Sequence, residues 1–128
     1  MSRYVTVGIA LLVGAALGAA AIQTLHAQAK PLAFNIAEIT INDAEAYNRD
    51  YLPPISKSIQ ESGGKFIVRG GKTVSVAGSP PAPRIAIIQF ENLDKAQAWL
   101  NSPAYKAAQP IGEKYATFRV YQVEGVSP

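Results

Sequence analysis

The spacing of apolar and polar positions changes along the chain, and each change predicts an element of secondary structure. Residues 33–41 (AFNIAEITI) mix apolar, β-branched and polar side chains in a way that is typical of a strand. The next segment has apolar residues at every fourth position, which predicts one buried face of an amphipathic helix. These residues are Tyr47, Tyr51, Ile55 and Ile59.

The ends of this helix are marked by residues that favour caps. Asn42, with Glu45 three positions later, is expected to cap its N-terminus, and Gly63-Gly64 is expected to end it. Pro53-Pro54 interrupts the run, because proline removes a backbone donor and clashes with the preceding turn. We therefore expect a kinked helix or two abutting helical pieces.

Glycine and proline divide the middle of the chain into short segments. Residues 65–69 (KFIVR) predict a strand, Gly70-Gly71 predicts a turn or bulge, and residues 72–77 (KTVSVA) alternate as if the strand resumes. After a loop at 78–83 (GSPPAP), residues 84–90 (RIAIIQF) form the most continuous apolar strand and are expected to lie in the centre of a sheet.

The last part of the chain predicts two helices and a strand. Asn92 is expected to cap the first of these helices. Its apolar face consists of Leu93, Ala96 and Leu100, with Trp99 beside them. Ser102-Pro103 begins a third, short helix, since serine caps and proline fits the first helical position, and Pro110 is expected to limit or kink it. Residues 117–124 (TFRVYQVE) alternate as a final strand.

The resulting order is β-α-β-β-α-β, which predicts an α+β, ferredoxin-like domain. In this arrangement a four-stranded antiparallel sheet carries its helices on one face. No helix remains to cover the other face. An uncovered sheet with apolar residues usually meets a partner, so we expect a homodimer that forms through the sheet faces.

The first 29 residues predict a signal peptide that precedes a domain at residues 30–128. Arg3 comes before an uncharged apolar run at 5–22, and Ala27-Gln28-Ala29 has the A-x-A form of a cleavage site. We expect a signal helix that is removed on export to the periplasm or the exterior. The alternative is an uncleaved membrane anchor, since the run is just long enough to span a bilayer. Only the anchored form is expected to contact a membrane.

Composition changes the picture once the signal is set aside. The chain has no cysteine, and its single histidine is His26, so residues 30–128 contain neither. This excludes Ser-His-Asp and Cys-His nucleophiles, and zinc or haem held by His or Cys. We therefore expect no metal and no cofactor. Eleven basic and nine acidic residues are spread along 30–128, so no nucleic-acid partner is expected.

Several short motifs occur in a fixed order along residues 33–125. They are Asp43-Ala44-Glu45-Ala46-Tyr47, Tyr51, Gly63-Gly64, Arg69-Gly70-Gly71, Pro83-Arg84, Gln89-Phe90-Glu91, Ala98-Trp99, Asn101-Ser102-Pro103, Tyr105 and Val123-Glu124-Gly125. With this set the chain resembles domain-of-unknown-function family 1330, in the dimeric α/β-barrel superfamily. The resemblance implies a ferredoxin-like protomer and a dimer whose two sheets face each other as a barrel. It implies no reaction.

Six residues are candidates for lining a ligand cleft between helix and sheet. They are Tyr47, Tyr51, Arg69, Arg84, Trp99 and Tyr105. Phenols donate hydrogen bonds or relay protons, arginine clamps a carboxylate or phosphate, and tryptophan stacks on a ligand. The structural alternatives are core packing for the aromatic residues and an ion pair or solvent exposure for the arginines. Glu91 and Glu124 end strands and are further candidates for a general base.

Three functions remain open. The first is an exported homodimer that binds a small apolar or aromatic molecule in the cleft. The second is a cofactor-free enzyme in the same cleft, of monooxygenase or isomerase type, by analogy with superfamily relatives. The third is a dimerisation or interaction module without a ligand. An open pocket with polar groups favours the first two, whereas a cleft filled by Trp99 and Leu100 favours the third.

Overall fold

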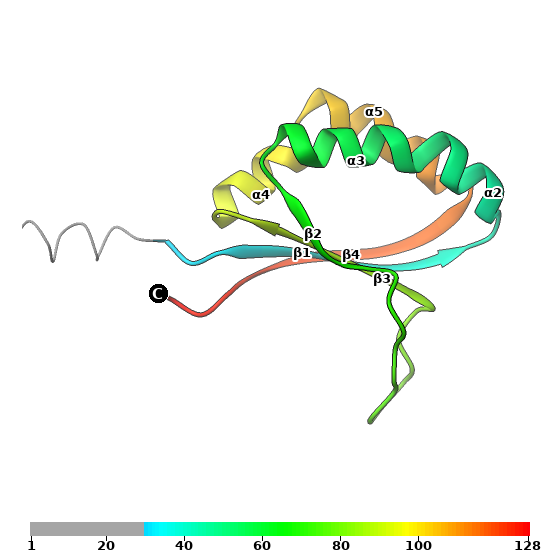
Figure 1. Cartoon of the computed structure of the whole chain (residues 1–128), viewed down its shortest axis with the longest axis horizontal. Coiled ribbons are helices and arrows are strands. Elements are labelled where there is room, and N and C mark those ends of the chain that lie inside the picture. The colour runs from blue at the N-terminus through cyan, green and yellow to red at the C-terminus, as the bar shows by residue number, and fades with distance from the viewer. Residues whose placement is uncertain (1–29) are drawn as a thin grey trace, which may run out of the picture. The chain divides into compact units, whose positions relative to one another are not determined.

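The computed structural model describes residues 30–128 (Figure 1). Its elements are β1 (Ala33–Ile41), α2 (Ala44–Ala46), the π-helix η1 (Tyr47–Tyr51), α3 (Leu52–Glu61), β2 (Lys65–Arg69), β3 (Arg84–Phe90), α4 (Leu93–Leu100), α5 (Pro103–Glu113) and β4 (Ala116–Glu124). The predicted signal helix at residues 1–29 lies outside the described part. Within 30–128, no helix is long and apolar enough to cross a membrane.

The four strands form one antiparallel sheet in the order β2-β3-β1-β4, and the helices lie over one of its faces (Figure 1). Strand β3 pairs with both β2 and β1, so its predicted internal place is confirmed. Alternate β1 residues, from Ala33 to Ile39, are buried beneath the helices. The predicted α+β, ferredoxin-like fold is confirmed.

The periodic face of the first helical segment packs into the core. Tyr47, Tyr51, Ile55 and Ile59 are all buried, as their spacing predicts. Trp99 on α4 is buried as well, and its indole Nε1 donates a hydrogen bond of 3.0 Å to the hydroxyl of Ser58 on α3. This bond ties α4 to α3 and fixes the orientation of the Trp99 ring.

The first helical segment starts one residue later than predicted. Asp43, not Asn42, is the N-cap, and its Oδ1 accepts a hydrogen bond of 3.1 Å from the backbone N–H of Ala46. The backbone N–H of Asn42 instead donates to the carbonyl oxygen of Tyr115 at 2.7 Å. That bond holds Asn42 beside the start of β4, so the turn into the helix begins only at Asp43.

The two prolines are accommodated by a wider helical turn rather than by a break. Pro53 and Pro54 lie in the first turn of α3, and the N–H of Leu52 reaches back to the carbonyl of Tyr47 to close a π turn. Proline has no N–H to give to the carbonyls of the preceding turn, which is consistent with a change of register just before it. Helix α5 likewise continues through Pro110 to Glu113.

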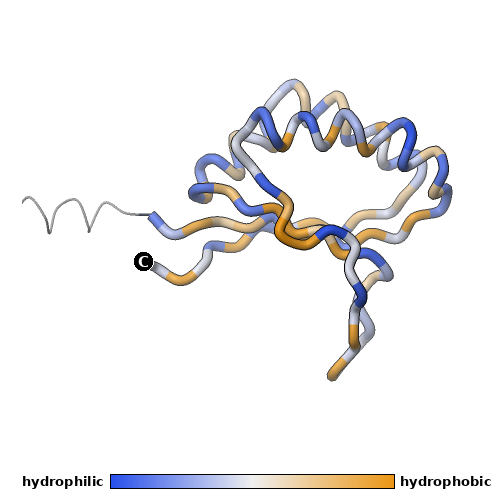
Figure 2. Tube along the Cα trace, in the orientation of Figure 1, coloured by the Kyte–Doolittle hydropathy of each residue, from blue (hydrophilic) through white to orange (hydrophobic). Residues whose placement is uncertain are grey.

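Residues 72–77 are not a strand, contrary to the prediction from their alternation. The β2–β3 pairing ends where the N–H of Gly70, with φ +69°, donates to the carbonyl of Ile85 at 2.8 Å. Beyond Gly70, Val74 and Val76 have no neighbouring strand to pair with among the described residues, and Val76 is 92% exposed. We call residues 70–83 the arm. It projects from the sheet on the side away from the helices and has a hydrophobic tip (Figures 1 and 2).

The face of the sheet opposite the helices carries many apolar side chains, and we call it the open face. By strand register its apolar members are Phe34, Ile36, Val68, Ile85, Ile87, Tyr121 and Val123. One ion pair crosses this face, with 2.7 Å between Arg119 Nη1 and Glu38 Oε2. No helix of the described residues covers the open face (Figure 1).

Candidate functional site

A cavity lies between the helices and the sheet, and two small residues form the middle of its floor. Ala37 of β1 and Ala86 of β3 are paired across the sheet. Arg69 of β2 lies opposite Ala86, and Val120 of β4 lies opposite Ala37. Because two methyl groups stand where larger side chains would fill the space, a hollow remains. The enclosed space that water can occupy is about 40 Å³, within a wider region of about 520 Å³ that includes open solvent.

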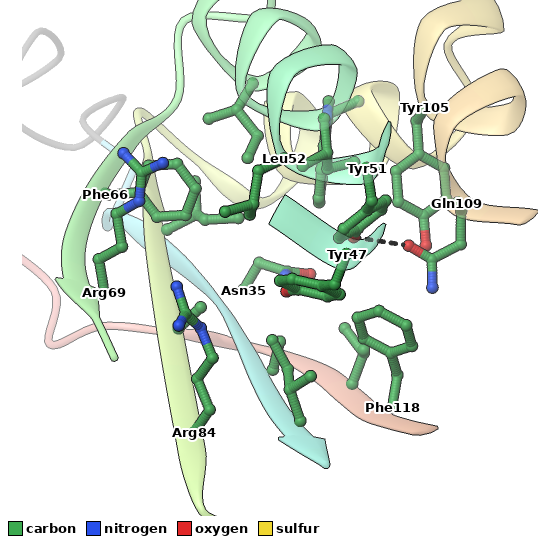
Figure 3. A pocket seen from close by; sticks show the side chains of 18 residues that line it. Asn35, Tyr47, Tyr51, Leu52, Phe66, Arg69, Arg84, Tyr105, Gln109 and Phe118 are labelled. Carbon is green, nitrogen blue, oxygen red and sulfur yellow. Dashed lines mark hydrogen bonds between the residues drawn. The ribbon is translucent and has the colours of Figure 1, made fainter. Parts of the chain in front are cut away.

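The walls of the cavity are mainly apolar, and aromatic rings form a large part of them (Figure 3). The rings are those of Tyr47, Tyr51, Phe66, Trp99, Tyr105 and Phe118. They contact one another at centroid distances such as 5.0 Å for Tyr47–Tyr51 and 4.7 Å for Trp99–Tyr105. All six predicted site residues therefore line one cavity. Their role as ligand contacts stays a prediction.

A bulge in β2 turns Arg69 into the cavity. Phe66 pairs with Ile88, but the next pair is Val68 with Ile87, so Ile67 is an extra residue on this strand. Side chains alternate between faces along a regular strand, which would place Phe66 and Arg69 on opposite faces. The extra residue brings both to the helix-covered face. The Arg69 guanidinium then lies 4.6 Å from the centroid of the Phe66 ring.

Arg84 enters the cavity from the first position of β3. Its guanidinium carbon lies 5.8 Å from the centroid of the Tyr47 ring. It also packs on Gly70, where an added Cβ would lie 3.2 Å from that carbon. Gly70 therefore leaves room for Arg84 as well as supplying the positive φ. None of the ion pairs among residues 30–128 involves Arg69 or Arg84.

The Tyr51 hydroxyl is held by helix α5. It donates to Oε1 of Gln109 at 3.1 Å, and its ring packs directly on the backbone of Gly112. Burial raises the pKa of Tyr51 far above the usual value for a phenol. The hydroxyl is therefore a hydrogen-bond donor, and not a base, at neutral pH.

The other two phenols of the cavity are also held in the protonated form. Burial raises the pKa of Tyr47, although the charges of Arg84 and Arg69 oppose the shift. Burial and the charge of Glu113 both raise the pKa of Tyr105. At neutral pH the cavity thus offers neutral hydroxyl donors and two cationic side chains.

Asn35 is a cavity residue that sequence reasoning missed. It is only 2% exposed, and its Oδ1 accepts a hydrogen bond of 3.1 Å from Nε2 of Gln122. Its Nδ2 donates to no residue of the described chain, although the side chain lines the cavity. Its position in the first strand could have identified it. Asn35 alternates with the inward-facing residues Ala33, Ala37 and Ile39, and it is the polar residue on that side of the strand.

Comparison with known proteins assigns the family. The model of a family described as "Domain of unknown function (DUF1330)" matches residues 32–126. The chain belongs to the DUF1330 family. This confirms the resemblance found in its motifs. No curated protein sequence matches the chain.

The solved structures of the RPA0582 protein share the fold of this DUF1330 protein at low sequence identity. The methylated RPA0582 protein is 15% identical, with a TM-score of 0.61 over 77% of this chain and 84% of that one. A second structure of RPA0582, from Rhodopseudomonas palustris and described as a protein of unknown function, is 14% identical, with a TM-score of 0.53 over 77% of this chain and 85% of that one. A protein of unknown function from Bacteroides thetaiotaomicron, described as a possible oxidoreductase, is 13% identical, with a TM-score of 0.48 over 76% of this chain and 99% of that one. The likeness to RPA0582 shows the fold alone.

The remaining candidates in this DUF1330 protein lie outside the cavity. Glu91 and Glu124 are exposed and do not line it. Ser102 is the N-cap of α5, where its hydroxyl accepts from the N–H of Tyr105 at 3.2 Å, as predicted. Among residues 30–128 there is no group of three or more His, Cys, Asp or Glu side chains placed to hold a metal ion.

Proposed function

We propose that this DUF1330 protein binds a small apolar or aromatic molecule in the cavity above Ala37 and Ala86. The observation that carries the proposal is an apolar cavity, lined in part by aromatic rings, that contains polar groups with no hydrogen-bond partner among residues 30–128. These groups are Nδ2 of Asn35 and the hydroxyl of Tyr47, both on nearly buried residues. Neither atom is fully enclosed, so water can bond it in the free protein, and a ligand that reproduces those hydrogen bonds can take the place of that water.

The geometry supports binding over the two alternatives. A cofactor-free reaction in this cavity needs a base to remove a proton, and the lining includes no carboxylate, while burial keeps the phenols protonated. An interaction module without a ligand predicts that Trp99 and Leu100 fill the cleft. Trp99 instead lines the cavity as one residue of its wall, and Leu100 is not among the lining residues.

The test uses the chain's single tryptophan, which lines the cavity. We expect members of a panel of small apolar and aromatic molecules to change the fluorescence of Trp99 and to raise the melting temperature. Saturation at about 100 times Kd adds about 2.7 kcal/mol. Ala86→Leu fills the floor and should abolish both effects, whereas Ala104→Leu on the exposed side of α5 should preserve them. Equal effects in the Ala86→Leu variant would overturn the proposal.

We also propose that a second copy of this chain covers the open face. Its apolar side chains would be removed from water by an identical face, since a two-fold interface brings the same patch together from both copies. The arm supports this occupant. It projects on the same side, with Val74 and Val76 exposed, so a body on the open face would also contact the arm.

Light scattering tests the dimer. We expect twice the protomer mass for the unmodified protein and a monomer for Tyr121→Glu, because this change places a charge on the open face. Tyr121 is 43% exposed in the protomer, so the variant should still fold. Val126→Glu, at a fully exposed position near the C-terminus, should remain dimeric. A monomeric unmodified protein would rule out this partner.

We propose export for this protein on the basis of residues 1–29 alone. N-terminal sequencing of protein recovered from outside the cytoplasm should find a chain that begins after Ala29. Ala27 is the alternative cleavage site. A chain that keeps Met1 and sediments with membranes would instead support the anchor.

A further inference from the structure

The two arginines of the cavity are close to each other. Arg69 pairs with Ala86, and Arg84 lies two residues before Ala86 on the neighbouring strand. The two side chains are therefore diagonal neighbours on the same face, which lie about 7–8 Å apart at their origins. Figure 3 shows both guanidinium groups on the same side of the Tyr47 ring. The cavity therefore has one end with two positive charges.

Nothing in the described chain neutralises these charges. Neither arginine takes part in an ion pair, and the lining includes no aspartate or glutamate. Arg69 is exposed and Arg84 is half-buried, but each guanidinium has a packing contact. Arg69 lies over the Phe66 ring, and Arg84 is half-buried against Gly70 and Tyr47. Holding two like charges near each other is unfavourable, and an anion between them removes the repulsion.

We infer that the ligand carries a carboxylate, held between Arg69 and Arg84 with a hydrogen bond from the Tyr47 hydroxyl, and an apolar body that lies over Ala37 and Ala86. The inference rests on the proposed function. Guanidinium groups bind carboxylates through paired, charge-assisted hydrogen bonds, and the Tyr47 hydroxyl has no hydrogen-bond partner within residues 30–128. The aromatic walls accept the rest of the molecule. The ligand class is therefore a small aromatic or aliphatic carboxylic acid.

Calorimetric titration with a matched series tests this class. The series is phenylacetate, phenylacetamide, 2-phenylethylamine and benzylphosphonate, which share one ring and differ in the charged group. We expect phenylacetate to bind at least about tenfold more tightly than the amide, and the amine to bind least. The preference for the acid should disappear in Arg69→Gln/Arg84→Gln. It should persist in Lys72→Gln/Lys95→Gln, which loses the same charge at exposed positions outside the cavity.

The outcomes separate this inference from the proposed function. Equal binding of the acid and the amide, with both lost in Ala86→Leu, would overturn the carboxylate class and leave the cavity as the binding site. An acid preference that survives in Arg69→Gln/Arg84→Gln would overturn the role of the arginines. Tighter binding of benzylphosphonate than of phenylacetate would assign a phosphonate-like group instead. Binding of the acid that Ala86→Leu does not change would overturn both proposals.

Discussion

Gly112 on α5 and Tyr51 in η1 are in direct contact across the helical layer, and the contact predicts a large energetic coupling. A Cβ at position 112 would lie 2.6 Å from Cε1 and 2.7 Å from Cδ1 of the Tyr51 ring. Carbon atoms pack at about 3.5–4.0 Å, so in Gly112→Ala the ring must move by about 1 Å. That movement also disturbs the 3.1 Å hydrogen bond to Gln109.

The expected magnitude combines opposing terms. Forcing an extra carbon into a packed region costs about 1–3 kcal/mol, and a weakened hydrogen bond adds about 1 kcal/mol. Alanine is a better helix former than glycine by about 1 kcal/mol. Gly112→Ala should therefore lower the free energy of unfolding by about 1–3 kcal/mol. In a Tyr51→Leu background, where the ring atoms are gone, the same change should be neutral or stabilising by up to about 1 kcal/mol.

Urea denaturation of the four proteins of this double-mutant cycle measures the coupling. We expect about 2 kcal/mol between the two positions. Gly71→Ala is the matched control, because nothing lies within 4 Å of its added Cβ, and it should change stability by less than about 1 kcal/mol. A coupling below about 0.5 kcal/mol would show that Tyr51 does not pack on Gly112.

Three other predictions concern stability. Above about pH 10, Tyr51 loses its phenolic proton in the unfolded chain but keeps it in the folded protein, where burial raises its pKa. The free energy of unfolding should therefore fall as pH rises, by about 1.4 kcal/mol per pH unit from this residue. In urea unfolding at several pH values, Tyr51→Phe should reduce this pH slope by that amount. Ser58→Ala removes the acceptor of the Trp99 indole and should cost about 1–3 kcal/mol in the same assay; a change under 0.5 kcal/mol, on the order of the error of additivity, would contradict the bond. Asp43→Ala should lose about 1 kcal/mol of helix capping, while Asn42→Ala should lose much less.

The sequence was sufficient for the fold because its signals were local and agreed with one another. The four-residue spacing of Tyr47, Tyr51, Ile55 and Ile59 specifies one buried helix face. Gly63-Gly64 ends that helix as predicted, with Gly63 at φ +79° and the N–H of Gly64 bonded to the carbonyl of Ile59. The alternation of apolar and polar residues at 72–77 in the arm wrongly predicted a strand. A strand forms only where a neighbouring strand pairs with it, and the sequence of one segment does not identify that neighbour.

The candidate site was less predictable because it depends on register. The six proposed residues were chosen by type and position, and all six line the cavity. The alanine floor was not foreseen, since Ala37 and Ala86 meet only through the pairing of β1 with β3. The direction of Arg69 depends on an unpaired Ile67. Both are consequences of which strands pair, and at which residues, that no local pattern reveals.

The most direct test of the binding proposal follows methyl and amide resonances during titration with phenylacetate. Ala86 and Ile87 are neighbours in β3 whose side chains point to opposite faces of the sheet. We predict large shifts for the methyl groups of Ala37 and Ala86, on the cavity floor, and little change for those of Ile36 and Ile87, on the open face. Shifts confined to the open face, or spread evenly over the surface, would contradict a ligand site in the cavity.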